Sequence, residues 1–358
     1  MKRSGTLLST EAFTFVELLV ASAILVVMMS FLLVVADQTA RIWSGASAKV
    51  EQFREARTGF ERVTTRLAQA TLNTYWDYDY NTASPPVPVR YARRSELRFI
   101  AGSAADLLGT SGSATRVTHA AFFNAPLGVT GSADYSGLAN ALNTLGYFAE
   151  FSDDAGQRPQ FINDAGIPVR WRFRLMEFSQ PTESFSSYRF TSGTPAAPNR
   201  ASTYAGTDWF RDDVNGTTVP KRVVAENVIA FIVTPRLAKA EELPLQTNAT
   251  HSPLAPDFSY DSTRTHTNPL LNPKNQLPPV VQLTMVAIDD KSAEKLDLDS
   301  TKADVFEIGK SNLFTNTENV AGDLATLEAT LAGLRVRHRI FTTNIHIRAA
   351  KWSREQIN

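Results

Sequence analysis

The first 80 residues carry two hydrophobic patterns, one after the other. Residues 18–36 read LLVASAILVVMMSFLLVVA, nineteen residues without a charge. A membrane-spanning helix needs about 20 apolar residues, and a helix buried in a soluble protein would normally show a polar stripe, which is missing here. We therefore predict a membrane-spanning helix, with Lys2 and Arg3 before it and Asp37 after it. Because basic residues favour the cytoplasmic side, we expect the amino terminus inside and the bulk of the chain outside.

After Asp37 the apolar positions recur three and four residues apart, which predicts an amphipathic helix. No proline occurs before Pro85, so we expect one helix running on to about Asn73, roughly 90 Å long. Gly45 and Gly59 each weaken such a helix by about 1 kcal/mol relative to alanine. The stripe is too short for a convincing coiled coil, so we favour packing on the chain's own sheet. The apolar stripe of this helix consists of Ala46, Val50, Phe53, Ala56, Phe60, Val63, Leu67 and Ala70.

Seven later segments have the short apolar or alternating pattern of β-strands. Long polar stretches separate some of them, over residues 179–219 and 237–277. Leucines at 324, 327, 331 and 334 predict one further helix. The predicted strands are Glu96–Ala101, Ala120–Asn124, Tyr147–Phe151, Val169–Phe178, Val228–Thr234, Pro279–Ile288 and Leu334–Arg348.

Two of these strands carry arginines on one face. In Val169–Phe178 the arginines alternate with apolar residues, which we interpret as a half-buried strand with a solvated arginine face. In Leu334–Arg348 the apolar residues occupy even-numbered positions up to Ile340 and odd-numbered positions from Phe341 onward. A change of this kind predicts a bulge or a break between two strands.

Composition and charge exclude several classes of function. The 358 residues include 36 basic and 36 acidic ones, and no cysteine. Zero formal net charge argues against a broad nucleic-acid footprint, and disulfides, thiol catalysis and cysteine-ligated zinc are excluded. No pair of histidines has metal-binding spacing, and no nucleophile, P-loop or dinucleotide motif occurs.

The amino-terminal residues "A-F-T-F-V-E-L-L-V" resemble the cleavage and methylation signal of type IV prepilins, with Ala12 where glycine is usual. The resemblance implies that a prepilin peptidase cuts between Ala12 and Phe13 and methylates the new amino group of Phe13. Glu17 then becomes the fifth mature residue. The family implies that this glutamate pairs with the terminal amine of a neighbouring subunit during assembly, whereas the residues alone also allow an interfacial carboxylate in headgroup water.

The order of the later segments extends the resemblance. "AENVIAFIVTPRL", "LPPVVQLTMVAIDDKSAEKL" and "RIFTTNIHIRAAKW" look like the closing strands of the larger, J-like minor pseudopilins of type II secretion. The chain is similar above all to the prepilin-like protein C family of the Verru_Chthon four-gene cassette. The implied fold is α+β and pilin-like, a long helix packed on a mainly antiparallel sheet. The implied parts are a leader (1–12), a transmembrane half-helix (13–36), an amphipathic half-helix (37–75) and a β-rich head with long loops (76–358).

The family therefore implies a minor pilin-like structural subunit, single-pass in the bacterial inner membrane, with its head in the periplasm or outside the cell. Its partners would be prepilin peptidase, other pilin or pseudopilin subunits and membrane lipid, with no nucleic acid, no cofactor and no enzymatic activity. Two alternatives stay open: an adhesive or ligand-binding surface pilin, and a membrane-anchored extracytoplasmic hydrolase. Asp77 and Asp79, between aromatic residues in YWDYDYNTASPPVP, are weak candidates for calcium ligands. A polar loop is the stronger interpretation, because calcium takes six to eight oxygens.

Overall fold

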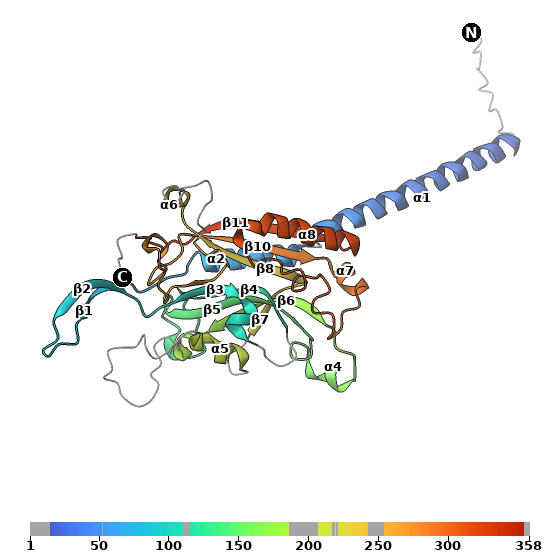
Figure 1. The fold of residues 1–358 in the computed structure, drawn as a ribbon. Coiled ribbons are helices and arrows are strands. Elements are labelled where there is room, and N and C mark those ends of the chain that lie inside the picture. The colour runs from blue at the N-terminus through green and yellow to red at the C-terminus, as the bar shows by residue number, and fades with distance from the viewer. Residues whose placement is uncertain are drawn as a thin grey trace, which may run out of the picture. The chain divides into compact units, whose positions relative to one another are not determined.

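The computed structural model describes residues 15–51, 53–109, 115–185, 207–216, 219, 221–242 and 254–353, and it gives only the backbone of residues 40–51, 240, 242 and 269. The chain divides into two compact units, residues 1–52 and 53–358. The architecture is α+β and pilin-like: a long apolar helix is followed by antiparallel sheets with some helices (Figure 1).

The described residues of the first unit form one helix, α1 (Phe15–Glu51). Its segment Phe15–Thr39 has 25 residues, a mean hydropathy of 3.0 and no buried residue. At 1.5 Å per residue this segment is about 37 Å long, enough to cross a hydrocarbon core of about 30 Å. Among the described residues it is the one helix with the length and composition of a membrane anchor or signal sequence.

The hydroxyl groups inside this apolar segment bond to the helix's own backbone. Ser22 donates to the carbonyl of Leu19 at 2.9 Å, and Ser30 donates to the carbonyl of Val26 at 2.8 Å. A polar group without a partner costs several kcal/mol in hydrocarbon. These local bonds make both serines compatible with lipid.

The amphipathic part is a separate helix, α2 (Arg54–Leu67), so the expected uninterrupted helix is instead two helices. Phe53 stands before α2 with φ −120° and ψ 18°, outside the helical region, and packs against the core of the head. α2 also ends before Asn73, because the following residues bond to other elements. Thr71 N–H donates to the carbonyl of Asn124, and the carbonyl of Ala68 accepts from Arg348 N–H.

The described residues of the second unit form three antiparallel sheets. Their strand orders are β1-β2, β11-β10-β8 and β7-β6-β5-β4-β3-β9. All seven strands expected from the sequence are present, and β1, β2, β7 and β9 are additional. The strands are β1 (Tyr75–Tyr80), β2 (Pro88–Arg94), β3 (Phe99–Ser103), β4 (Thr115–Pro126), β5 (Leu142–Ser152), β6 (Arg172–Gln180), β7 (Lys221–Glu226), β8 (Val228–Arg236), β9 (Tyr260–Asp261), β10 (Val280–Ile288) and β11 (His338–His346).

The second unit also contains further helices, some of which pack on the larger sheets. The predicted leucine-rich helix is α8 (Val320–Gly333), and its Leu327 and Leu331 are buried. The other helices are α3 (Ala104–Leu108), α4 (Gln160–Asp164), α5 (Asp208–Asn215), α6 (Lys239–Glu242) and α7 (Asp290–Lys295), and short 3-10 turns are η1 (Ala133–Tyr135), η2 (Thr182–Ser184), η6 (Pro269–Leu271) and η7 (Thr317–Asn319).

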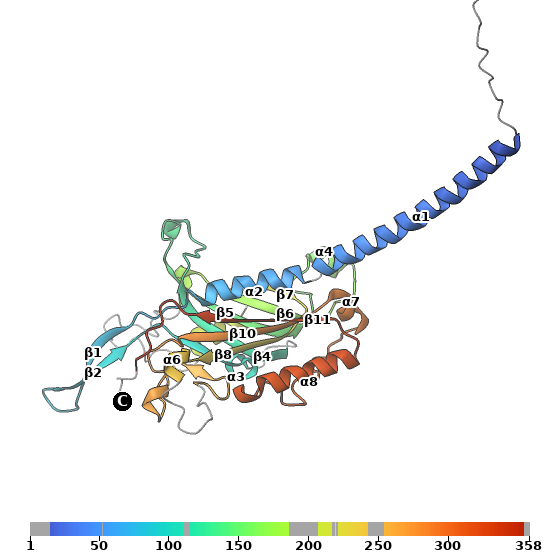
Figure 2. The ribbon, with the colours of Figure 1, turned by 90° about the horizontal axis from the view of Figure 1, so that it is seen from above.

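Three apolar clusters hold these layers together. The largest, here the central core, combines the buried side of α2 with residues of both larger sheets. A second cluster packs α8 against the opposite face of β8 and β10, and a third packs α3 and α5 against the opposite face of the six-stranded sheet. Figure 2 shows α2 on one side of strands β8, β10 and β11 and α8 on the other.

The arginine face of β6 is buried, so its interpretation as a solvated face is wrong. Direct cross-strand neighbours form a row of alternating charge over four strands, Arg116–Glu150–Arg174–Glu226. Arg174 is fully buried and Glu150 is 6% exposed. Arg116 and Arg174 therefore each have a carboxylate beside them, which offsets the cost of removing these charges from water.

The switch of apolar residues from even to odd positions in β11 marks neither a bulge nor a break, so the expectation of one is wrong. β11 pairs with β10 in one continuous register from His338 to His346. The apolar pattern changes because each face of the strand is covered at a different end. Ile340 packs with the α8 cluster, whereas Ile345 packs in the central core under α2.

A bulge in β4 joins the two larger sheets. At this bulge Thr118 has a positive φ of 53°, and its hydroxyl bonds to both the N–H and the carbonyl of Phe231 in β8. The next residue, His119, accepts from Val233 N–H at its Nδ1 and donates from its Nε2 to the carbonyl of Phe314. Burial lowers the pKa of His119 to about 4, so the imidazole is neutral in the folded protein.

We predict that His119 makes the protein less stable in acid. In the unfolded chain a histidine titrates near pH 6.5, so the folded-state pKa of about 4 gives a stabilisation that is complete above pH 6.5. It is lost as the pH falls towards 4, by about 3 kcal/mol in all. Denaturant unfolding between pH 7 and 4 measures this dependence. His119→Gln should flatten it, whereas Gln at the exposed His266 should leave it unchanged; equal slopes in all three proteins would contradict the assignment.

Candidate functional site

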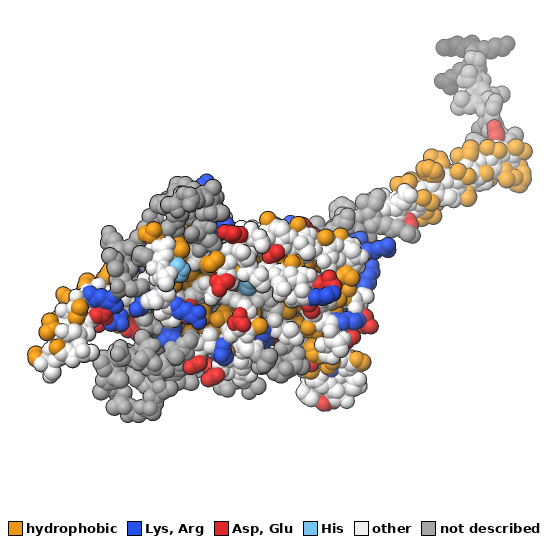
Figure 3. Space-filling model, viewed as in Figure 1, with side chains coloured by type: hydrophobic (Ala, Val, Ile, Leu, Met, Phe, Trp, Pro, Cys, Tyr) orange, Lys and Arg blue, Asp and Glu red, His pale blue; other side chains and the backbone are white. Residues whose placement is uncertain are grey.

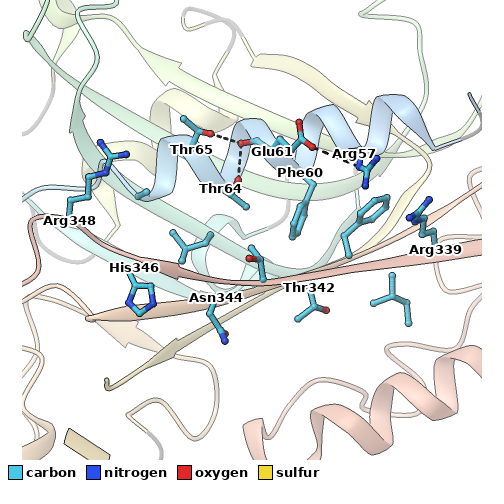
Figure 4. Close-up of a pocket in the computed structure, with 15 residues that line it drawn as sticks. Arg57, Phe60, Glu61, Thr64, Thr65, Arg339, Thr342, Asn344, His346 and Arg348 are labelled. Atoms are coloured by element: carbon cyan, nitrogen blue, oxygen red, sulfur yellow. Dashed lines mark hydrogen bonds and ion pairs between the residues drawn. The ribbon is translucent and has the colours of Figure 1, made fainter. Parts of the chain in front are cut away.

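A groove of about 720 Å³ lies between α2 and β11 (Figure 4). Phe60 and Phe341 meet inside it, with ring centroids 5.6 Å apart. Residues 339–346 of β11 line it without a gap, so the groove follows the strand along its length. The groove is therefore shaped by one helix face and one whole strand.

Gly59 lets α2 approach β7 closely on the other side of the helix. A Cβ at this position would lie 3.1 Å from both the Val224 Cγ1 and the Ala225 Cβ, and 3.3 Å from the Val224 carbonyl oxygen. The sequence suggested only that Gly59 weakens the helix. In the structure the missing side chain of Gly59 allows α2 to pack directly against β7.

A bidentate ion pair between α2 and the sheet fixes the helix in this position, with Glu177 buried and the Arg62 side chain 42% exposed. Arg62 donates two hydrogen bonds to Glu177 of β6, at 2.7 and 2.6 Å, and the Tyr147 hydroxyl donates a third at 2.6 Å. Burial alone would raise the pKa of Glu177, but the bonds from Arg62 and Tyr147 hold that pKa below its usual range. Bidentate arginine–carboxylate pairs of this kind are strong and directional. Arg62 carried no signal in the sequence beyond its place on a helix.

The rim of the groove is mainly basic. Three arginines line it, Arg57, Arg339 and Arg348, against the single acid Glu61. Arg57 and Glu61 lie 3.8 Å apart and both are well exposed, so their attraction is weak in water. Arg339 lies over the Phe341 ring, 5.4 Å from its centroid. The groove is thus suited to polypeptide or other ligands that carry negative charge.

Asp77 and Asp79 lie in a β-hairpin and not in a loop. They are in β1, which pairs with β2. Asp79 accepts from both Arg90 and Arg94, and the Arg90 bond lowers its pKa. The described residues contain no group of three or more His, Cys, Asp or Glu that could hold a metal ion. The Asp79 carboxylate is thus already occupied by two guanidinium groups.

The opposite face of the same hairpin is aromatic and exposed. Trp76 stacks on Tyr91 with centroids 5.3 Å apart, and Tyr78 contacts the same ring at 5.0 Å. These three side chains are 47%, 57% and 51% exposed, respectively. Figure 3 shows hydrophobic side chains gathered over this hairpin. This ribbon was not predicted from the sequence, although the alternation of aromatic residues in YWDYDY is a signal for it.

The processing residues expected from the sequence are only partly visible. The leader (1–12), Ala12 and Phe13 lie outside the described residues. Glu17 lies in the first described turn of α1. The structure therefore places the acid at one end of the apolar segment.

Searches against protein-family models, curated proteins and solved structures found no match.

We predict that Gly59→Val destabilises the protein by about 1–3 kcal/mol, because the added atoms overlap Val224 and Ala225. Urea unfolding of the full-length protein in detergent measures this. Gly322→Val is the matched control, since nothing lies within 4 Å of a Cβ there. Equal stability of the two variants would show that α2 does not need its close approach to β7.

Proposed function

We propose that this chain is a minor pilin-like subunit, or pseudopilin, anchored in the bacterial inner membrane. A prepilin peptidase processes it, and it joins a type II secretion or type IV pilus-like filament at or near the tip. One observation carries the proposal: a fully exposed apolar helix of membrane length precedes an amphipathic helix whose apolar side is part of the core of a β-rich head. The sequence AFTFVE at the start of the apolar helix supports it.

Glu17 has the main role in this proposal. Cleavage after Ala12 leaves Phe13 with a positively charged amine, four residues before Glu17. A carboxylate within an apolar helix costs free energy in lipid, and the amine of a neighbouring subunit offsets that cost. The pair then sets the axial position of one subunit against the next.

Mass spectrometry of the mature amino terminus tests the proposal. We expect N-methyl-Phe13 as the first residue of the protein recovered from the membrane. An intact Met1, or cleavage after residue 36, would overturn it.

Glu17→Ala extends the same test to assembly. The variant should still be cleaved and should remain in the membrane, because its apolar helix is intact, but it should be lost from sheared filaments. Asp37→Ala, at the far end of the same apolar helix, is the control and should be incorporated. Normal incorporation of Glu17→Ala would refute the pairing role even with N-methyl-Phe13 present.

A second candidate function, adhesion, is favoured by the exposed aromatic ribbon on β1 and β2. Exposed Trp and Tyr rings are concentrated where proteins bind ligands and partners. For this function we expect saturable binding of the full-length protein to members of a glycan array, and loss of that binding in Trp76→Ala. Phe161→Ala, which removes a ring that is 70% exposed elsewhere, should bind as the unchanged protein does. Absence of any binding by the unchanged protein would contradict adhesion to glycans.

A further inference from the structure

β11 is the outer strand of its sheet. In the part of the chain that the structure describes, it pairs with β10 on one side and with no strand on the other. It is nine residues long, contains no proline and shows no register shift against β10. Natural proteins normally shorten, kink or cover such an edge, because its free backbone groups attract other strands. β9, at one edge of the six-stranded sheet, has only two residues.

The backbone groups on the free side of β11 can be identified from the bonds at both ends of the strand. Ile347 N–H donates to the carbonyl of Pro279, and Asp289 N–H donates to the carbonyl of Arg337. In an antiparallel pair, alternate residues direct both backbone groups to the partner. Odd-numbered residues of β11 therefore bond to β10, and the even-numbered ones, Thr342 and Asn344 among them, direct their N–H and C=O groups away from it.

The surroundings of this edge determine what fits it. A row of alternating N–H and C=O groups is matched along its length by another extended backbone, the mode known as β-strand addition. The groove of about 720 Å³ along the strand gives space for the side chains of such a backbone. Arg339 near one end of β11 and Arg348 just beyond the other are both exposed, so charge complementarity favours acidic side chains near the two ends of the added strand.

We propose that the free edge of β11 binds an extended, acid-bearing segment of a partner protein, which adds to the sheet as a fourth strand beside α2. Backbone hydrogen bonds to even-numbered residues supply the affinity, and the arginines select the charge. This inference stands apart from the proposed function, because it depends only on the edge and the groove of the head.

Synthetic peptides test the proposal on the full-length protein in detergent micelles. The probe is a fluorescent decapeptide of alternating Thr and Val with an aspartate at each end, and binding is measured by fluorescence anisotropy. We expect it to bind at least tenfold more tightly than the same peptide with lysine at each end. Methylation of all backbone nitrogens of the probe should abolish binding, because neither edge of the peptide could then donate to β11. Equal binding of the methylated and unmethylated probes, or no binding of the aspartate probe, would overturn the proposal.

Matched variants locate the binding. Asn344→Pro removes one outward N–H without removing a bond to β10, so the probe should bind at least tenfold more weakly. Asn344→Ala retains that N–H and should bind as the unchanged protein does. Because proline can disturb a strand in other ways, the double variant Arg339→Glu/Arg348→Glu gives a second readout: it should prefer the lysine-ended peptide. Unchanged charge preference, or equal binding by the Pro and Ala variants, would refute the site.

Discussion

The head depends on the packing of α2 into the space between its two larger sheets. The buried residues of this helix, Phe60, Val63 and Leu67 among them, belong to the same apolar cluster as residues of β4, β5, β8 and β10. Burial of one large apolar side chain contributes about 1.5–3 kcal/mol, so this one helix face is a substantial part of the stability of the head. The close approach at Gly59 and the bidentate Arg62–Glu177 pair then fix where the helix lies.

The same requirement explains why the apolar and amphipathic patterns follow each other without a long linker. Residues 15–39 have an apolar surface on every side, which is stable in lipid. Residues 54–67 have one apolar side, which is stable only against protein. Only the stretch between them, 40–53, joins a segment suited to a bilayer to one that is part of the core of the head. The pilin-like architecture combines both properties in one chain.

Local patterns in the sequence predicted much of this fold, and contacts between distant segments account for what they missed. The apolar helix, the stripe of α2, the leucines of α8 and seven strands are all periodic within a few residues, so the sequence shows them directly. The row Arg116–Glu150–Arg174–Glu226 is not visible in this way, because each charge finds its partner on another strand. The alternation within one strand predicted a solvated Arg174, because it does not show the carboxylates on the neighbouring strands.

The candidate site was harder to predict for the same reason. Nothing in the sequence brings α2 beside β11, which are separated by more than 270 residues, and the free edge is a property of the sheet and not of the strand. The β1–β2 hairpin was not predicted, because Asp77 and Asp79 were interpreted as part of a polar loop or as metal ligands. The aromatic residues that alternate with them are the signal for a strand. Phe53, at the start of α2, has a non-helical backbone and packs against the core of the head, a contact that helix propensity does not encode.

The two helices of the amino-terminal region have surfaces suited to different surroundings, lipid for residues 15–39 and the core of the head for α2. Because the chain has no cysteine, single cysteines at Ser30 and Ala56 can be tested with a water-soluble maleimide in membrane vesicles that expose the head. We expect Ser30→Cys to stay unreactive in urea and to react only after detergent is added, whereas Ala56→Cys should react as soon as urea unfolds the head. Reaction of Ser30→Cys in untreated membranes, or release of both sites by urea alone, would contradict this expectation.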